Sequence, residues 1–472
     1  MSFSISTDLK QNMEYFNQVL RVDENFDIIY QTFEIGGKKA CLYFVDGFTK
    51  DEILQKLLVE FEGYQEGDVP EDIHGFIKKK LPYIELDVIT EEQAIIKNLL
   101  SGVTILFIDG YQSAIAMDCR TYPARSVDEP EKDKVMRGSR DGFVETIVFN
   151  TALIRRRIRS PQLVNKMLEV GTSSRTDVVI SYMEGRCNEK ILKKLMDKIQ
   201  TLDVDSLSMN QESLAECLFK RLWFNPFPKF KYTERPDTAA ACILEGSIIV
   251  LVDNSPAAMI IPCTIFDIIQ EADDYYFPPF TGTYLRLSRI ITDLIALVIT
   301  PLFVLLMNNP DLIPKGLEFI KVKEEMNIPL VWQFLILEFA VDGLRLASIN
   351  TPSMLSTPLS VAAALIIGDF TVSSGWFNAE AMLYMAFVMI ANYTQANYEL
   401  GYAIKFLRIL ILILTSIFDV WGFAIGVVIA IASFAFNKTF TGTSYIYPLI
   451  PFNGRKLFRK LCRTTLPNSK NQ

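Results

Sequence analysis

The chain has 472 residues, 50% of them hydrophobic, and a formal net charge of -8 at pH 7. A chain of this length usually forms two or three domains. Its acidic balance does not favour nucleic acid as a partner. Seven scattered cysteines and a single histidine, His74, give poor support to a zinc site.

The beginning of the chain shows no targeting pattern. The residues MSFSISTDLKQ lack the basic and apolar regions of a signal peptide. Cysteines that form no CxxC pair fit a reducing compartment. We therefore expect roughly the first 280 residues to stay in the cytoplasm.

Residues 1–125 alternate helical and strand patterns and predict a first α/β subdomain. The expected elements are a helix at 9–26, strands at 39–45 and 104–108, and an amphipathic helix at 50–62. Three segments look alike: LYFVDGF at 42–48, ILFIDGY at 105–111 and IIVLVDN at 248–254. Strands that lead into turns explain the likeness, and an ancient internal duplication is the weaker alternative.

Residues 126–285 predict a second α/β subdomain, which follows a polar connector at 126–140. The expected elements are an arginine-rich helix at 141–169, a strand at 177–182 and a helix at 188–200. The run from Arg155 to Arg159 is interpreted as a solvated or subunit-contacting face. The loop RGSRDG at 137–142 matches no nucleotide motif and predicts a structured turn or a subunit contact.

Residues 286–436 predict an all-α polytopic membrane domain, because about 20 apolar residues cross the bilayer core. Four spans are expected at 287–307, 328–349, 357–377 and 379–397. The stretch 402–436 is long for one span and short for two. We expect a short hairpin that bends near Asp419–Gly422, with one tilted span as the alternative, so the domain has four to six spans.

Positive charge predicts the orientation of these spans. With a cytoplasmic N-terminus, Arg286 and Arg289 precede the first span on the inner side, and Lys405 and Arg408 lie inside again. The tail at 437–472 has no acidic residue and seven basic ones: Lys438, Arg455, Lys456, Arg459, Lys460, Arg463 and Lys470. Such a segment after a span predicts a cytoplasmic, lipid-facing end.

The chain lacks the motifs of nucleotide-driven or hydrolytic catalysis. No phosphate-binding loop and no dinucleotide-binding glycine pattern follows a strand. One histidine gives little basis for a catalytic triad. We therefore expect that the protein is not an enzyme.

The second expected span carries three charges, Glu338, Asp342 and Arg345, on one helical face. Charged groups in hydrocarbon usually face a bundle interior or a water-filled path. One interpretation is an intramembrane salt-bridge cluster that locks the bundle. The other is a polar lining for ions. Both interpretations hold if the cluster braces a helix that lines the pore.

The third expected span begins after two Thr-Pro steps, where proline starts or breaks a helix. It has small or hydroxyl side chains on one stripe: Thr357, Ser360, Ala364 and Gly368. Close helix packing is one explanation of this stripe. In a ring of subunits it can line a narrow pore, and the flanking Leu359 and Val361 can then gate the pore by dewetting.

Long ordered segments of the chain resemble one known family. They are residues 118–163, RTDVVISYMEG at 175–185, NPFPKFKYTERPDTAAACILEG at 225–246, VLVDNSPAAMIIP at 250–262, PDLIPKGLEFI at 310–320 and YIYPLIPFN at 445–453. Together they resemble the GerA family of spore germination proteins, A-subunit type. The resemblance covers nearly the whole chain, and it fits either a germinant-receptor A subunit or a sporulation paralogue of that subunit.

The resemblance implies a multi-pass protein of the spore inner membrane with a cytoplasmic N-terminal domain. Family A subunits are expected to form homopentameric channels that release monovalent cations during germination. The implied partners are further copies of the chain, membrane lipid, and other germination membrane proteins, either receptor B and C subunits or a small membrane partner. No metal, nucleotide or covalent cofactor is implied.

Overall fold

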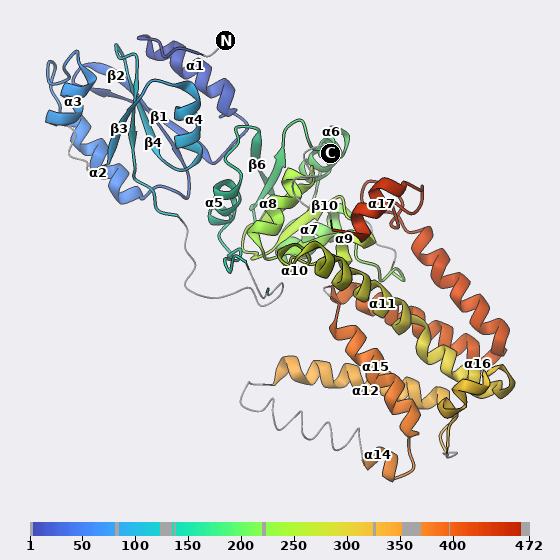
Figure 1. Ribbon diagram of the computed structural model, residues 1–472. Coiled ribbons are helices and arrows are strands. Elements are labelled where there is room, and N and C mark those ends of the chain that lie inside the picture. Colours follow the sequence, from blue (N-terminus) through green and yellow to red (C-terminus); the bar gives the residue numbers. More distant parts are fainter. Residues whose placement is uncertain are drawn as a thin grey trace. The chain divides into compact units, whose positions relative to one another are not determined.

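The computed structural model describes residues 3–80, 85–122, 135, 138–219, 223–323, 327–351, 370–395 and 397–463. The chain forms two compact units (Figure 1). The N-terminal unit consists of Met1–Lys220 and Phe230–Pro262, and the helical unit consists of Arg221–Lys229 and Cys263–Gln472. The helical unit thus begins before residue 286, where the long apolar runs start.

The first half of the N-terminal unit is a five-stranded antiparallel sheet, in the order β1-β2-β4-β5-β3. Its elements are α1 (Leu9–Leu20), β1 (Ile28–Ile35), β2 (Lys38–Val45), α2 (Asp51–Glu62), α3 (Ile73–Lys80), β3 (Leu86–Ile89), α4 (Glu92–Leu100), β4 (Thr104–Ile108) and β5 (Ala114–Met117). Helices α1 and α4 cover one face of the sheet, and α2 and α3 cover the other.

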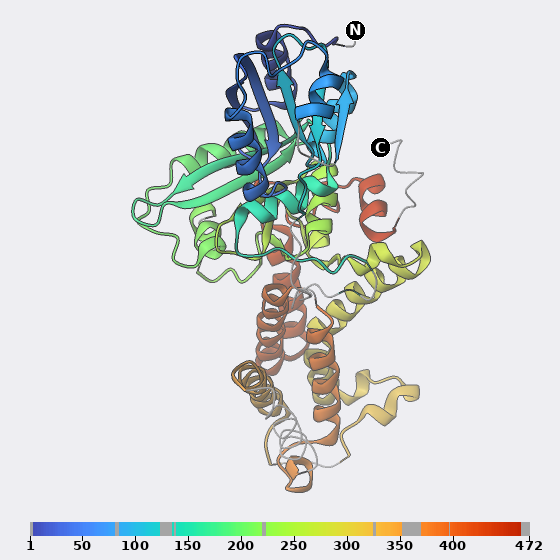
Figure 2. The same ribbon diagram turned by 90° about the vertical axis from the view of Figure 1, so that its left-hand side faces the viewer.

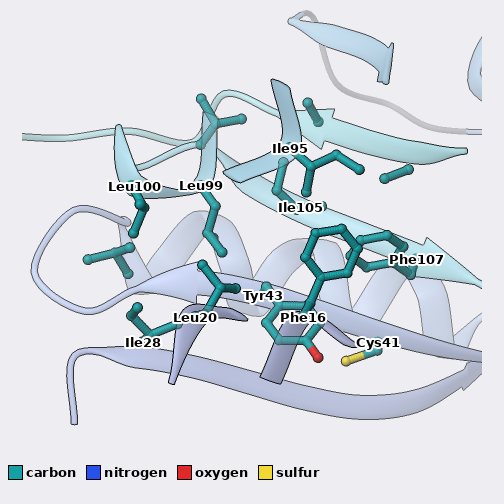
Figure 3. Close-up of a cluster of buried hydrophobic side chains, with 14 of the residues drawn as sticks. Phe16, Leu20, Ile28, Cys41, Tyr43, Ile95, Leu99, Leu100, Ile105 and Phe107 are labelled. Atoms are coloured by element: carbon teal, nitrogen blue, oxygen red, sulfur yellow. The ribbon is translucent and has the colours of Figure 1, made fainter. Parts of the chain in front are cut away.

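Successive side chains of each strand point to opposite faces of the sheet, so this half has two hydrophobic cores. Cys41 and Tyr43 of β2 point to the face under α1 and α4, whereas Ala40 and Leu42 point to the opposite face. Figure 3 shows the first of these cores, in which Phe16 of α1 lies against the sheet. All five side chains are at most 1% exposed, and burying an aromatic ring in this way contributes about 2–3 kcal/mol.

The second half of the N-terminal unit is another five-stranded antiparallel sheet, in the order β6-β7-β9-β10-β8. Its elements are α5 (Ile147–Arg157), β6 (Leu163–Val170), β7 (Thr176–Met183), α6 (Glu189–Gln200), α7 (Asn210–Leu218), β8 (Lys231–Thr233), α8 (Pro236–Leu244), β9 (Ile248–Val252) and β10 (Ala258–Ile261). Helices and strands follow one another as in the first half, with the same strand order.

Equivalent asparagines in the two halves support an internal duplication that produced them. Asn12 in α1 accepts from the Ser6 N–H at 2.8 Å and donates to the Ser6 carbonyl at 2.7 Å. Asn150 in α5 accepts from the Val144 N–H at 2.8 Å and donates to the Val144 carbonyl at 2.6 Å. Both asparagines are buried, and each holds the segment that leads into its helix.

Equivalent aspartates support the same conclusion. Asp109, after β4, accepts from the Leu9 N–H at the start of α1, at 3.0 Å. Asp253, after β9, accepts from the Ile147 N–H at the start of α5, at 3.2 Å. Carboxylates satisfy free N–H groups at helix N-termini. The likeness of segments 105–111 and 248–254 thus reflects equivalent strands, and the structure favours the internal duplication.

A buried ion pair joins the two halves. Arg155 of α5 pairs with Asp27, which precedes β1, and both side chains are fully buried. Asn25 accepts from Arg155 at 3.0 Å and from the Asn165 N–H at 2.8 Å. The interpretation of this arginine run as a solvated or subunit-contacting face is therefore wrong for Arg155. Sequence spacing could not show that the arginine meets an acid 128 residues away.

The turn expected at 137–142 is held by Arg157. This arginine donates to Asp141 at 2.6 and 2.7 Å and to the Ser139 hydroxyl at 3.1 Å. Burial raises the pKa of the Asp141 carboxyl, but the bonds from Arg157 and Ser139 outweigh burial, so this pKa is lowered overall. These bonds hold Ser139 and Asp141 in place within one chain, which fits a structured loop.

The described residues of the helical unit are mainly helical. Its elements are α9 (Ile265–Ile269), α10 (Asp273–Tyr276), α11 (Pro279–Asn308), η1 (Pro310–Leu312), η2 (Lys315–Ile320), α12 (Leu330–Asn350), α14 (Phe370–Ser373), α15 (Ala379–Tyr393), α16 (Tyr398–Ala435) and α17 (Gly454–Leu461). Figures 1 and 2 together show α12 lying across α15 and α16. By length and composition, α11 and α16 are the two helices of the described residues that could cross a membrane.

Helix α16 is a hairpin of two arms. Its backbone leaves the helical conformation at Asp419, where φ is 55° and ψ is -128°. The arms touch at two glycines, because a Cβ at Gly422 would lie 1.9 Å from the Leu414 carbonyl oxygen and one at Gly426 would lie 3.0 Å from the Ile411 Cα. The predicted bend near Asp419–Gly422 is therefore present, and Figure 2 shows the arms side by side.

Candidate functional site

The charges of α12 lie on one face of the helix, as their spacing predicts. Glu338 is only 4% exposed, and Asp342 and Arg345 are half-buried. A carboxylate as deep as Glu338 requires a counter-charge and hydrogen bonds, because burying an isolated charge is very costly.

The counter-charges come from the first arm of α16. Arg408 donates from Nε to Oε1 of Glu338 at 2.7 Å, and its Nη2 lies 2.6 Å from the same oxygen. Lys405 lies 3.6 Å from Oε2 of Glu338 and also pairs with Asp342. We call Glu338, Asp342, Lys405 and Arg408 the charged network. It contains two carboxylates and two cations, so its formal charges balance.

Helix α11 also contacts the charged network. Arg408 donates from Nη1 to the Ala296 carbonyl at 3.1 Å. Pro301, about one turn further along α11, has no N–H to give to the preceding turn. The bond from Arg408 therefore ties α16 to α11 where the helix is weakened, and one guanidinium connects three helices.

Arg345 is not the counter-ion of Glu338 or Asp342, and the expectation that it pairs with one of them is wrong. Its guanidinium lies over the rings of Tyr398 and Tyr402, at 4.4 and 5.4 Å from their centroids. This is a cation–π arrangement. The correct partners were visible in the sequence as two cations three residues apart, Lys405 and Arg408, but sequence spacing did not show which helices pack together.

A small cavity lies beside the charged network. It has a volume of about 20 Å³ and is lined on its polar side by Asp342, Arg345, Asn392 and Lys405. A space of this size holds one water molecule and no larger ligand. The cavity therefore gives no support to a small-molecule site.

Other polar groups of the helical unit also pair between segments. Three side-chain pairs do so: Asp293 of α11 with Gln395 at 2.5 Å, Asn309 with Asp419 at 2.7 Å, and Gln333 of α12 with Asn378 at 2.7 Å. Polar groups that are satisfied in this way hold helices together in an apolar environment. Within the described residues they form contacts between helices rather than the walls of an open path.

A second ionic cluster lies at the start of α11. Asp274 is fully buried and pairs with Arg286 at 3.3 Å and with Arg289. Arg289 also pairs with Glu271 at 2.7 Å. Nearby, burial raises the pKa of Asp267, but the charge of Lys460 on α17 outweighs burial, so this pKa is lowered overall. The cluster fixes the first turns of α11 to α9, α10 and α17.

The expected pore or gate residues lie outside the described residues. They are Thr357, Leu359, Ser360, Val361, Ala364 and Gly368. Their role therefore stays a prediction. Over the described ranges, no group of three or more histidine, cysteine, aspartate or glutamate side chains could hold a metal ion.

Comparisons with known proteins give a consistent result. A family model described as Bacillus/Clostridium GerA spore germination protein matches residues 14–472. Stage V sporulation protein AF of Bacillus subtilis is 35% identical over 461 residues, which cover 98% of this chain and 93% of that protein. Spore germination protein KA of Bacillus subtilis is 27% identical over 461 residues, which cover 96% of this chain and 83% of that protein.

A solved structure also resembles part of the chain. It is the N-terminal domain of the A subunit of the Bacillus megaterium spore germinant receptor GerK3. The match has a TM-score of 0.42 and 24% identity, and it covers 55% of this chain and 96% of that one.

Proposed function

The chain belongs to the GerA family of spore germination proteins, and we propose that it is the channel-forming subunit of a homopentamer that releases monovalent cations during germination. In this proposal the helical unit crosses the spore inner membrane several times, and the N-terminal unit lies in the cytoplasm. The family consists of membrane proteins with roles in germination or sporulation, which is the premise from which the channel is inferred.

The observation that carries the proposal is that the charged network has no net formal charge, because its two carboxylates pair with two cations. In the described part of the chain, the two carboxylates of α12, Glu338 and Asp342, are balanced by Lys405 and Arg408 of α16. The described residues of one copy therefore offer no ready polar path, and in this proposal the conducting path forms on a symmetry axis between copies. The stripe from Thr357 to Gly368 is the proposed lining of that path.

Exposed apolar side chains on the helical unit fit such an assembly. Phe339 and Ile349 of α12 are 81% and 73% exposed, and Phe387 and Ile390 of α15 are also exposed. Large apolar side chains in these positions contact lipid or a neighbouring copy. Other germination membrane proteins, such as receptor B and C subunits or a small membrane partner, are the proposed heterologous partners.

Reconstitution tests the channel against its competitor, a non-conducting scaffold that organises germinant receptors. We expect liposomes that contain the purified chain to release potassium faster than empty liposomes. A scaffold predicts equal release. Equal release from liposomes with correctly folded and oriented protein, in the presence of its germination partners, would contradict the channel.

Crosslinking tests the number of subunits. Treatment of native membranes with a short lysine-reactive reagent should give a ladder of bands that ends near five copies. Fusion of the membranes with excess lipid before crosslinking, which lowers the density of the protein in the bilayer, is the control for random collisions. A ladder that ends at two copies, with potassium release intact, would exclude the pentamer.

Variants at Leu359 and Val361 test the gate. A narrow apolar ring closes by dewetting, so a smaller or more polar side chain should favour the open state. We expect Leu359→Ala or Val361→Ser to make spores leak ions early or to lower the stimulus that they need. The proposal fails if a scan across Thr357–Gly368 yields no leaky or hypersensitive variant at normal protein levels.

A further inference from the structure

The segment that follows α16 is strongly basic. Residues 437–463 include Lys438, Arg455, Lys456, Arg459, Lys460 and Arg463 and no acidic residue. Lys460 pairs with Asp267, whereas Arg455 and Lys456 are exposed on the first turn of α17. We call Tyr445–Leu461 the C-terminal foot.

The C-terminal foot also exposes large apolar side chains. Phe452 is 73% exposed and Phe458 is 60% exposed, and Leu449 and Ile450 lie beside them in the chain at 45% and 49%. Short helices that combine basic residues with exposed apolar ones lie in the interface of a lipid bilayer. A protein surface in water rarely leaves such side chains uncovered.

Contacts fix the foot to the start of α11. Arg286 of α11 donates to the Lys460 carbonyl at 2.8 Å, and the Arg463 N–H donates to the Thr283 hydroxyl at 3.0 Å. Gln270 donates to the same Lys460 carbonyl at 3.2 Å. The foot and the first turns of α11 are therefore at the same level of the helical unit.

The length of α11 places that level at the headgroups. Its 30 residues extend about 45 Å at a rise of 1.5 Å per residue. A bilayer with its headgroups is about 40–45 Å thick, with a hydrocarbon core of about 30 Å. The first turns of α11 thus lie within the headgroup layer, and the foot lies beside them.

Exposed aromatic side chains mark the same level. Phe280, in the first turn of α11, is 86% exposed, and Phe436, at the end of α16, is 83% exposed. Trp223 is 99% exposed and lies close in the chain to Asn225, which contacts Asn437 at 3.3 Å. Tryptophan and other aromatic residues are enriched at membrane–water interfaces.

We propose that the C-terminal foot binds anionic phospholipid headgroups of the leaflet at which α11 begins and α16 ends. Arg455, Lys456 and Arg459 would contact the phosphates, and Phe452 and Phe458 would insert between the acyl chains. This binding rests on the proposed membrane insertion of α11 and α16 and does not require ion conduction.

Hydrogen exchange of the full-length chain in lipid nanodiscs tests the proposal. One set of discs contains phosphatidylcholine alone, and the other contains phosphatidylcholine with about one-third phosphatidylglycerol, because anionic lipid attracts basic segments. We expect backbone amides of α17 to exchange at least tenfold more slowly in the anionic discs. The variant Arg455→Gln/Lys456→Gln should lose this difference, and Phe458→Ser should reduce it.

A matched variant on another basic helix is the control. Lys190→Gln/Lys193→Gln on α6 removes the same charge from two exposed positions and should leave the lipid dependence of α17 unchanged. Wild-type exchange in α11 and α16 shows that the helical unit of each variant is folded. Equal exchange of α17 in both sets of discs overturns the proposal. Protection that rises with protein concentration but not with anionic lipid assigns the surface to a second copy and also overturns it.

Discussion

Replacing Arg408 by methionine should lower the free energy of unfolding of the helical unit by about 3–5 kcal/mol. Arg408 supplies the shortest ionic contacts of Glu338, which is 4% exposed, and also donates to the Ala296 carbonyl of α11. Methionine keeps much of the volume but leaves the carboxylate with Lys405 alone, at 3.6 Å. Denaturant unfolding of the purified chain in mild detergent, followed by circular dichroism, measures the loss.

Arg345→Met is the matched control for this variant. Arg345 lies over two tyrosine rings and is half-buried, so its removal should cost about 1 kcal/mol or less. The double variant Glu338→Leu/Arg408→Met removes both charges and should recover most of the lost stability. If Arg408→Met and Arg345→Met are equally mild, Arg408 is not the main counter-ion of Glu338.

The double variant also separates the two interpretations of the charged network. A brace requires that α11, α12 and α16 be held together, and an apolar pair can do this as well as an ion pair. Potassium release by liposomes with the double variant should then match the wild type. A folded double variant that no longer conducts would indicate that Glu338 and Arg408 line the path.

The sequence predicted features that depend on local pattern. Alternation and turn signals located β2 and β4 of the first sheet, and apolar runs located α11 and α12 to within a few residues apart from the first turns of α11. The stretch 402–436 is long for one span, and basic residues lie at both of its ends, which indicated the bend of α16 near Asp419–Gly422. These features are set by neighbours in the chain.

Features set by distant residues were missed. The partner of Arg155 is Asp27, and the partner of Glu338 is Arg408. In each case the spacing defines a helical face but not the segment that packs against it. In the sequence the duplication is visible only as likeness between short segments, and the segment of β2 resembles them equally. The strand order identifies β4 and β9 as the equivalent pair.

Replacing Gly422 by alanine should separate the two arms of α16. A Cβ at this position would lie 1.9 Å from the Leu414 carbonyl oxygen, and real Cβ atoms essentially never approach within 3.0 Å. The clash is with backbone, so no side-chain rotation relieves it. We expect a loss of about 3 kcal/mol or more in unfolding free energy, at the upper end of overpacking in a close-packed interior. Thermal unfolding in detergent and the amount of folded protein in membranes measure this loss.

Gly343→Ala is the control that separates packing from helix propensity. Gly343 lies in α12, and a Cβ there meets nothing within 4 Å, so alanine should be neutral or should stabilise the helix by up to about 1 kcal/mol. Gly426→Ala should fall between the two, because its Cβ would lie 3.0 Å from the Ile411 Cα. This order of three glycines follows from a hairpin whose arms touch most closely near the bend. A single tilted helix has no contact between Gly422 and Leu414, and it predicts that all three substitutions are mild.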